Sequence, residues 1–181
     1  MNLLALSGSL RRASFNTRLA EVMAERAPEG AVVEVATCRG IPLYDGDVED
    51  EHGIPEPVEA LRQRIQAADG LILVTPEYNG GMPGVFKNAL DWLTRPPKEM
   101  APTFKDRPTA LAGATPGGLG TTLAQAGSLV MLRQLKVHLH AEHLRVSQAG
   151  DVLGDDGEVE HKTAMLIEKW LSGFCEFARR G

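Results

Sequence analysis

The chain has 181 residues, the length of one ordinary domain and enough to bury a core without disulfides or metal ions. Its net charge is −5 and no run of lysine and arginine exceeds a pair, so a nucleic-acid-binding surface is not expected and the partners should be small molecules. The two cysteines, Cys38 and Cys175, form no C-x-x-C pair and no apolar run approaches the ~20 residues of a membrane span, so we expect reduced thiols in a soluble, cytoplasmic protein.

Short apolar runs alternate with segments of helical periodicity along the whole chain. The predicted strands cover residues 3–6, 32–36, 71–74, 109–113 and 143–146. The predicted helices cover residues 17–27, 58–68, 85–92, 122–137 and 163–180. Because parallel neighbours need crossover connections, this alternation predicts an α/β fold with a doubly wound, five-stranded parallel sheet, order 2-1-3-4-5, and helices on both faces. We expect one domain, residues 1–181, with acidic surface segments at 37–57 and 150–160, the second of them a hairpin or a loop.

The turn after the first predicted strand is rich in groups that bind phosphate. It carries four hydroxyl or amide side chains, one glycine and two arginines, namely Ser7, Gly8, Ser9, Arg11, Arg12, Ser14 and Asn16. A helix follows directly, and its N-terminal N–H groups favour an anion. No G-x-G-x-x-G or G-K-[ST] pattern is completed after Gly8, so the loop suits the phosphomonoester of flavin mononucleotide (FMN) better than ATP. An ordinary serine-rich helix N-cap is the alternative interpretation.

Two glycine-rich loops follow the third and fourth predicted strands. Residues 75–84 contain three glycines and two prolines, which give a rigid backbone that can face a flat ring, and Tyr78 offers a stacking surface. Residues 115–121 contain three glycines that can bring backbone amides to the edge of a ligand. Each loop alone is also compatible with a structural turn. In the predicted strand order, however, the loops after strands 1, 3 and 4 meet at one edge of the sheet.

Three motifs in these segments carry a family resemblance. They are Gly-Ser-Leu-Arg-Arg-Ala-Ser-Phe-Asn at residues 8–16, Pro-Glu-Tyr-Asn at 76–79 and Lys-Asn-Ala-Leu-Asp-Trp-Leu at 87–93. Together they resemble the NADPH-dependent FMN reductase family of flavodoxin-like proteins, and within it the soluble quinone reductases also described as chromate reductases. Residues 41–45 and 132–134 match further segments of those proteins, so the resemblance spans nearly the whole chain.

The resemblance implies an FMN-dependent NAD(P)H oxidoreductase. The FMN contacts that it implies are Ser9, Arg11, Ser14, Phe15, Asn16, Thr17, Pro76, Glu77, Tyr78, Asn79, Gly80, Thr115, Pro116, Gly117, Gly118 and Gly120. NADPH or NADH would pass a hydride to flavin N5, and quinones, flavins, azo dyes or chromate would then take the electrons in a ping-pong mechanism. Backbone N–H groups of residues 117–120 would stabilise the reduced ring, so no catalytic side chain is needed. Relatives are generally dimers or tetramers, and helices 85–92 and 122–137 are the expected subunit contacts. Arg133 is expected either in an interface ion pair of a tetramer or as a solvated helix charge.

Other chemistry-bearing side chains have simpler interpretations. Lys87 and Asp91 have the spacing of a surface ion pair on a helix. We expect Glu77 to be a solvated loop carboxylate. The alternatives are that it interacts with a neighbouring cation or lines the substrate entrance. No Cys-rich or carboxylate-rich framework surrounds the three clustered histidines, so no metal site is expected at His138, His140 and His143.

Two other functions remain open at the level of sequence. A flavodoxin-like electron carrier or flavin-binding interaction module would hold FMN without nicotinamide activity, but a carrier usually presents a strongly acidic face and a net charge of −5 is mild. A nucleotide-binding regulator without redox chemistry would use the same glycine-rich loops and would purify without flavin.

Overall fold

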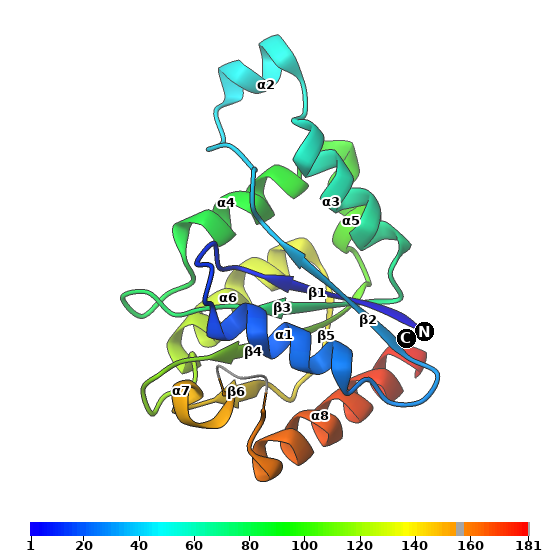
Figure 1. Cartoon of the computed structure of the whole chain (residues 1–181). Helices are drawn as coiled ribbons and strands as arrows, with labels where there is room; N and C mark the ends of the chain where they lie inside the picture. The colour runs from blue at the N-terminus through cyan, green and yellow to red at the C-terminus, as the bar shows by residue number, and fades with distance from the viewer. Residues whose placement is uncertain (155–157, 181) are drawn as a thin grey trace.

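A parallel β-sheet forms the centre of the computed structural model, which describes residues 1–154 and 158–180 (Figure 1). The strands pair in the order β2-β1-β3-β4-β5, all in parallel, which confirms the predicted fold class and strand order. The predicted fifth strand corresponds to β6, which pairs with the last residues of β4, whereas β5, which was not predicted, pairs with its first residues. The strands are β1 (Asn2–Ser7), β2 (Val32–Thr37), β3 (Gly70–Val74), β4 (Pro108–Ala114), β5 (His138–Leu139) and β6 (Leu144–Val146).

The long helices agree with the five predicted ones to within a turn at each end. They are α1 (Phe15–Glu25), α3 (Glu56–Ala67), α4 (Gly84–Leu93), α6 (Thr122–Leu135) and α8 (His161–Arg180). Short helical segments outside the predicted ones are α2 (Gly46–His52), η1 (Pro97–Glu99), α5 (Met100–Phe104) and α7 (Ala149–Val152). The segment 150–160 is thus helical where it begins, and its residues 155–157 lie outside the described residues.

The central strands are apolar on both sides, so helices cover both faces of the sheet. In β1, Leu3 and Ala5 join a core cluster with residues of α1 and α8, whereas Leu4 and Leu6 join a cluster with residues of α3, α4 and α6. Figure 1 shows the same division, with α1 and α8 on one side of the sheet and α3 and α4 on the other. The carboxyl ends of the strands are therefore left to the connecting loops.

A surface arm, residues 38–55, connects β2 to α3 and carries α2, which stands away from the sheet in Figure 1. None of the α2 side chains is buried, so the arm lacks the apolar periodicity that reveals a helix in a sequence. Asp45 begins α2, because its Oδ1 accepts a hydrogen bond of 3.0 Å from the Asp47 N–H. The arm is tied to α4 by Asn88, whose amide accepts from Tyr44 N–H and donates to Pro42 O, both at 2.8 Å.

His140 lies just after β5 in a cluster of aromatic rings from α8. Its ring centroid is 5.0 Å from that of Phe177, 5.7 Å from Phe174 and 6.3 Å from Trp170. Its Nε2 has no hydrogen-bond partner among the residues that the structure describes. Burial lowers the pKa of His140, which means that the folded chain disfavours the charged ring.

We expect the free energy of unfolding to decrease as the pH falls below about 6.5, because the unfolded chain then binds a proton that folded His140 resists. Urea unfolding at about pH 7.5 and about pH 5.5 measures this decrease. The His140→Gln variant should show a smaller decrease, and His52→Gln, at the exposed His52 on α2, is the control variant. An undiminished decrease in His140→Gln would contradict the assignment.

Candidate functional site

Three loops meet at the carboxyl edge of the sheet, as the strand order predicts. We call them the β1 loop (residues 8–14), the β3 loop (75–83) and the β4 loop (115–121), after the strands that they follow. The three strands are neighbours and their ends lie close together, because Ser7 pairs with Val74 and Val74 pairs with Ala112, two residues before the end of β4.

The β1 loop is shaped by its own hydroxyl groups. The Oγ of Ser7 lies 2.9 Å from Thr17 Oγ1 and accepts from the Ser9 N–H at 3.4 Å. The Oγ of Ser9 accepts from the Arg11 N–H at 3.3 Å, and the Oγ of Ser14 caps α1 by accepting from the Thr17 N–H at 3.2 Å. These bonds give the loop a defined shape without a ligand.

Close packing also fixes where the β1 loop begins. The Gly8 N–H donates to Val74 O at 2.9 Å, so the chain leaves β1 against the end of β3. A Cβ on Gly8 would overlap the ring of Phe86, which is fully buried. Any residue with a Cβ is therefore excluded at this position by the Phe86 ring.

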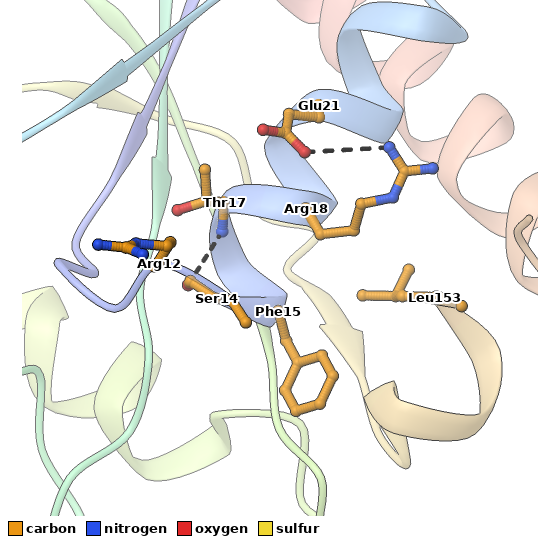
Figure 2. A pocket seen from close by; sticks show the side chains of 9 residues that line it. Arg12, Ser14, Phe15, Thr17, Arg18, Glu21 and Leu153 are labelled. Carbon is orange, nitrogen blue, oxygen red and sulfur yellow. Dashed lines mark hydrogen bonds and ion pairs between the residues drawn. The ribbon is translucent and has the colours of Figure 1, made fainter. Parts of the chain in front are cut away.

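The first turn of α1 presents free donors and positive charge. The backbone N–H groups of Phe15 and Asn16 and the guanidinium groups of Arg11 and Arg12 have no partner among the described residues. A helix start adds about half a positive charge. A cavity of about 210 Å³ opens beside this turn, and Figure 2 shows Ser14 and Phe15 at its edge and Arg18 turned toward Glu21. The turn can therefore bind a phosphate group through N–H and guanidinium donors.

The Asn16 side chain is used for a different purpose. It is only 4% exposed, its Nδ2 donates to Ala114 O and its Oδ1 accepts from Ala114 N–H, both at 2.9 Å. These two bonds join α1 to the end of β4. For an anion at the β1 loop, the free donor of this residue is its backbone N–H.

The β3 loop closes into a tight turn. The Tyr78 N–H donates to Gly81 O at 2.8 Å and the Gly81 N–H donates to Tyr78 O at 3.1 Å. Between them, Asn79 has φ 52° and Gly80 has φ 75°, the two positive φ angles of a type I′ turn. Tyr78 is 56% exposed, so its ring is available to cover a flat ligand.

Glu77 makes two hydrogen bonds that its sequence context did not indicate. Its Oε2 accepts hydrogen bonds from the N–H groups of Leu123 at 2.8 Å and Ala124 at 2.9 Å. The carboxylate is therefore bound to the first turn of α6 while Glu77 stays half-buried.

Thr115 organises the β4 loop. Its Oγ1 accepts from the Gly120 N–H at 3.1 Å and donates to Gly117 O at 3.2 Å. Gly120 has φ 55°, and a Cβ there would lie 2.9 Å from Arg145 Cβ, so the loop passes directly over β6. The Gly120 N–H is already paired, whereas those of residues 117–119 have no partner in the described part of the chain and can face a ligand.

Arg39 is a residue of this edge that sequence reasoning missed. It follows β2, and its Nη2 donates to Leu10 O in the β1 loop at 2.7 Å. In the predicted strand order, a cation just after strand 2 lies beside the loop after strand 1, and this is the signal that could have found it.

Other predicted features can be placed as well. Lys87 Nζ lies 2.7 Å from Asp91 Oδ1, so the expected surface ion pair is confirmed. Cys38 and Cys175 are free and buried, and burial raises the pKa of both thiols. Within residues 1–154 and 158–180, no helix is both long and apolar enough to cross a membrane.

Comparison with known proteins gives consistent matches over this chain. The sequence model described as NADPH-dependent FMN reductase matches residues 1–151. A Pseudomonas aeruginosa protein named NAD(P)H-dependent FMN reductase is 38% identical over 99% of this chain and 96% of its own length. A quinone reductase of Escherichia coli K12 is 35% identical over 99% of this chain and 96% of its own. The solved structure of FerB, a flavoenzyme NAD(P)H:(acceptor) oxidoreductase from Paracoccus denitrificans, superposes with a TM-score of 0.87 at 30% identity, covering 99% of this chain and 97% of that one.

Proposed function

The chain belongs to the NADPH-dependent FMN reductase family, and from this premise we propose that it binds FMN and passes electrons from NAD(P)H to quinones. The observation that carries the proposal is the start of α1, where free N–H groups of its first turn and two arginines of the β1 loop are neighbours of two glycine-rich loops. A phosphate group requires the first feature and a flat ring system fits the second.

We assign the FMN contacts to the three loops. The phosphate is assigned to the β1 loop and the start of α1, at Ser9, Arg11, Ser14, Phe15, Asn16 and Thr17. The ring system is assigned to the β3 and β4 loops, at Pro76, Glu77, Tyr78, Asn79, Gly80, Thr115, Pro116, Gly117, Gly118 and Gly120. The free N–H groups at both ends of this site support the assignment, because they match a phosphate at one end and a polar ring edge at the other.

Bound FMN supplies the redox chemistry, by accepting a hydride from the nicotinamide and passing electrons to the acceptor. The β3 and β4 loops would hold the ring, with Tyr78 available to cover it and the N–H groups of residues 117–119 available to its polar atoms. No side chain is assigned a catalytic role. Quinones are the acceptors named for a relative, and flavins, azo dyes and chromate are further candidates.

We further propose a single FMN-binding domain, residues 1–181, that forms a homodimer or homotetramer in the cytoplasm. Both core clusters pack on the same sheet, which supports one domain. Exposed side chains on α4 and α6 support subunit contacts, namely Val85, Leu123, Leu129, Val130 and Arg133. Two unbridged thiols support a reducing compartment. Light scattering measures the assembly, and a monomer at working concentration would contradict it.

The visible spectrum of FMN-loaded protein tests the function. Under anaerobic conditions, we expect NADPH to bleach the bound flavin and benzoquinone to restore its colour, whereas free FMN at the same concentration keeps its colour with NADPH. Bound flavin that NADPH does not bleach would favour the electron carrier. Protein that binds no flavin would contradict the site itself.

Initial rates test the order of the steps. If NADP⁺ leaves after the hydride transfer and before the quinone binds, double-reciprocal plots against NADPH at several quinone concentrations run parallel. Convergent lines would require both substrates on the enzyme together and would replace the ping-pong scheme.

A further inference from the structure

The first turn of α6 has no cap of its own. Thr121, at the N-cap position, has φ 61° and ψ 29° and makes no side-chain bond to the helix start. Its Oγ1 instead accepts from Gln125 Nε2 at 2.8 Å. A helix start leaves unpaired N–H groups and a partial positive charge, so α6 requires a partner from another segment.

Glu77 is that partner. Its Oε2 accepts hydrogen bonds from the N–H groups of Leu123 and Ala124, the second and third residues of α6. These are the N–H groups to which an N-cap side chain normally bonds. A carboxylate at a helix N-terminus makes charge-assisted bonds, about twice as strong as neutral ones. The cap thus comes from a residue 46 positions before Leu123 in the chain.

The bond joins the two loops that are assigned to the flavin ring. Glu77 directly precedes the tight turn at residues 78–81, while α6 directly continues the β4 loop. The turn also packs on α6, because a Cβ on Gly80 would lie 3.6 Å from Leu123 Cδ1. A shift of the α6 start relative to Glu77 would therefore change the gap between the β3 and β4 loops.

We propose that Glu77 is a positioning residue, whose carboxylate holds the β3 loop to the start of α6. It thereby sets both the width of the gap between the β3 and β4 loops and the charge beside the flavin ring. This inference rests on the proposed function. The negative charge outweighs the partial charge of about +0.5 at the start of α6. The ring site therefore stabilises an anionic, reduced flavin less with the Glu77 carboxylate than it would with the uncapped α6 N-terminus. Removal of the charge should therefore favour reduced over oxidised FMN.

Two variants separate the effect of the hydrogen bonds to α6 from the effect of the negative charge. Glu77→Ala removes both, and we expect the dissociation constant of FMN, measured by quenching of flavin fluorescence, to increase about tenfold. Glu77→Gln keeps an acceptor oxygen and should weaken FMN binding less than Glu77→Ala does. Its two-electron midpoint potential should increase by about 30 mV, equivalent to a tenfold change in the ratio of the dissociation constants of oxidised and reduced FMN.

Asp45 provides the matched control, because it is also a carboxylate that caps a helix, α2, and it lies on the surface arm. Asp45→Ala should lower the melting temperature without changing FMN affinity or potential. If the Glu77 variants behave in the same way, Glu77 is a helix cap alone and the proposal is overturned. Should Glu77→Ala fail to fold, the potential of Glu77→Gln decides, and an unchanged potential overturns the proposal. A wild-type protein that binds no FMN would instead contradict the proposed function.

Discussion

Replacement of Asn16 by alanine should lower the free energy of unfolding by about 3 kcal/mol and weaken FMN binding by more than about tenfold. The Asn16 side chain pairs with both polar backbone atoms of Ala114, and at 4% exposure water cannot take over these bonds. Each buried polar group left unpaired costs about 1–3 kcal/mol. The change also releases α1 from β4, so the free N–H groups of its first turn lose their fixed direction. Urea unfolding and a flavin fluorescence titration measure the two effects.

Asn88 is the control for this prediction, because its amide makes the same pair of bonds, to Pro42 O and Tyr44 N–H, near the surface. Water can replace these bonds, so Asn88→Ala should cost less than about 1 kcal/mol and leave FMN affinity unchanged. Asn16→Asp should also be destabilised, since its carboxylate would face the Ala114 carbonyl. Equal losses in Asn16→Ala and Asn88→Ala would contradict the argument from burial.

The sheet and the long helices could be predicted because each follows a local pattern. β3, for example, is an uninterrupted apolar run that is buried on both faces, as expected for a central parallel strand. α2 could not be predicted, because it buries no side chain and therefore shows no apolar periodicity. β5 has only two residues, too few for a strand pattern to appear.

The place of the candidate site could be predicted, but the hydrogen-bond partners within it could not. The strand order brings the β1, β3 and β4 loops together, and the sequence patterns indicate that order. Asn16, however, bonds to a residue 98 positions away, and Glu77 bonds to one 46 positions away. A polar side chain in a loop indicates hydrogen bonding, but its type does not separate a ligand contact from a contact that shapes the loop.

The Gly113→Ala variant should lose about 3 kcal/mol of stability and should not bind FMN at concentrations that saturate the wild type. A Cβ on Gly113 would lie 2.5 Å from the carbonyl oxygen of Thr75 and would overlap Thr121 Oγ1. Neither group has room to move, because Thr75 and Thr121 are fully buried and the Thr75 N–H is bonded to Ala112 O. Thr75 begins the β3 loop and Thr121 ends the β4 loop, so relief of the clash must displace both loops of the proposed ring site.

A second substitution shows where the cost of Gly113→Ala arises. Thr121 has φ 61°, which glycine adopts without strain, and Thr121→Gly removes one of the two clashing groups. The double variant should therefore recover about 1 kcal/mol, but it should stay below the wild type because the Thr75 carbonyl remains. Gly127→Ala is the control within α6, where a Cβ meets no atom within 4 Å, and it should gain about 0.5–1 kcal/mol. Wild-type stability in Gly113→Ala would show that β3, β4 and the start of α6 are less closely packed than this geometry requires.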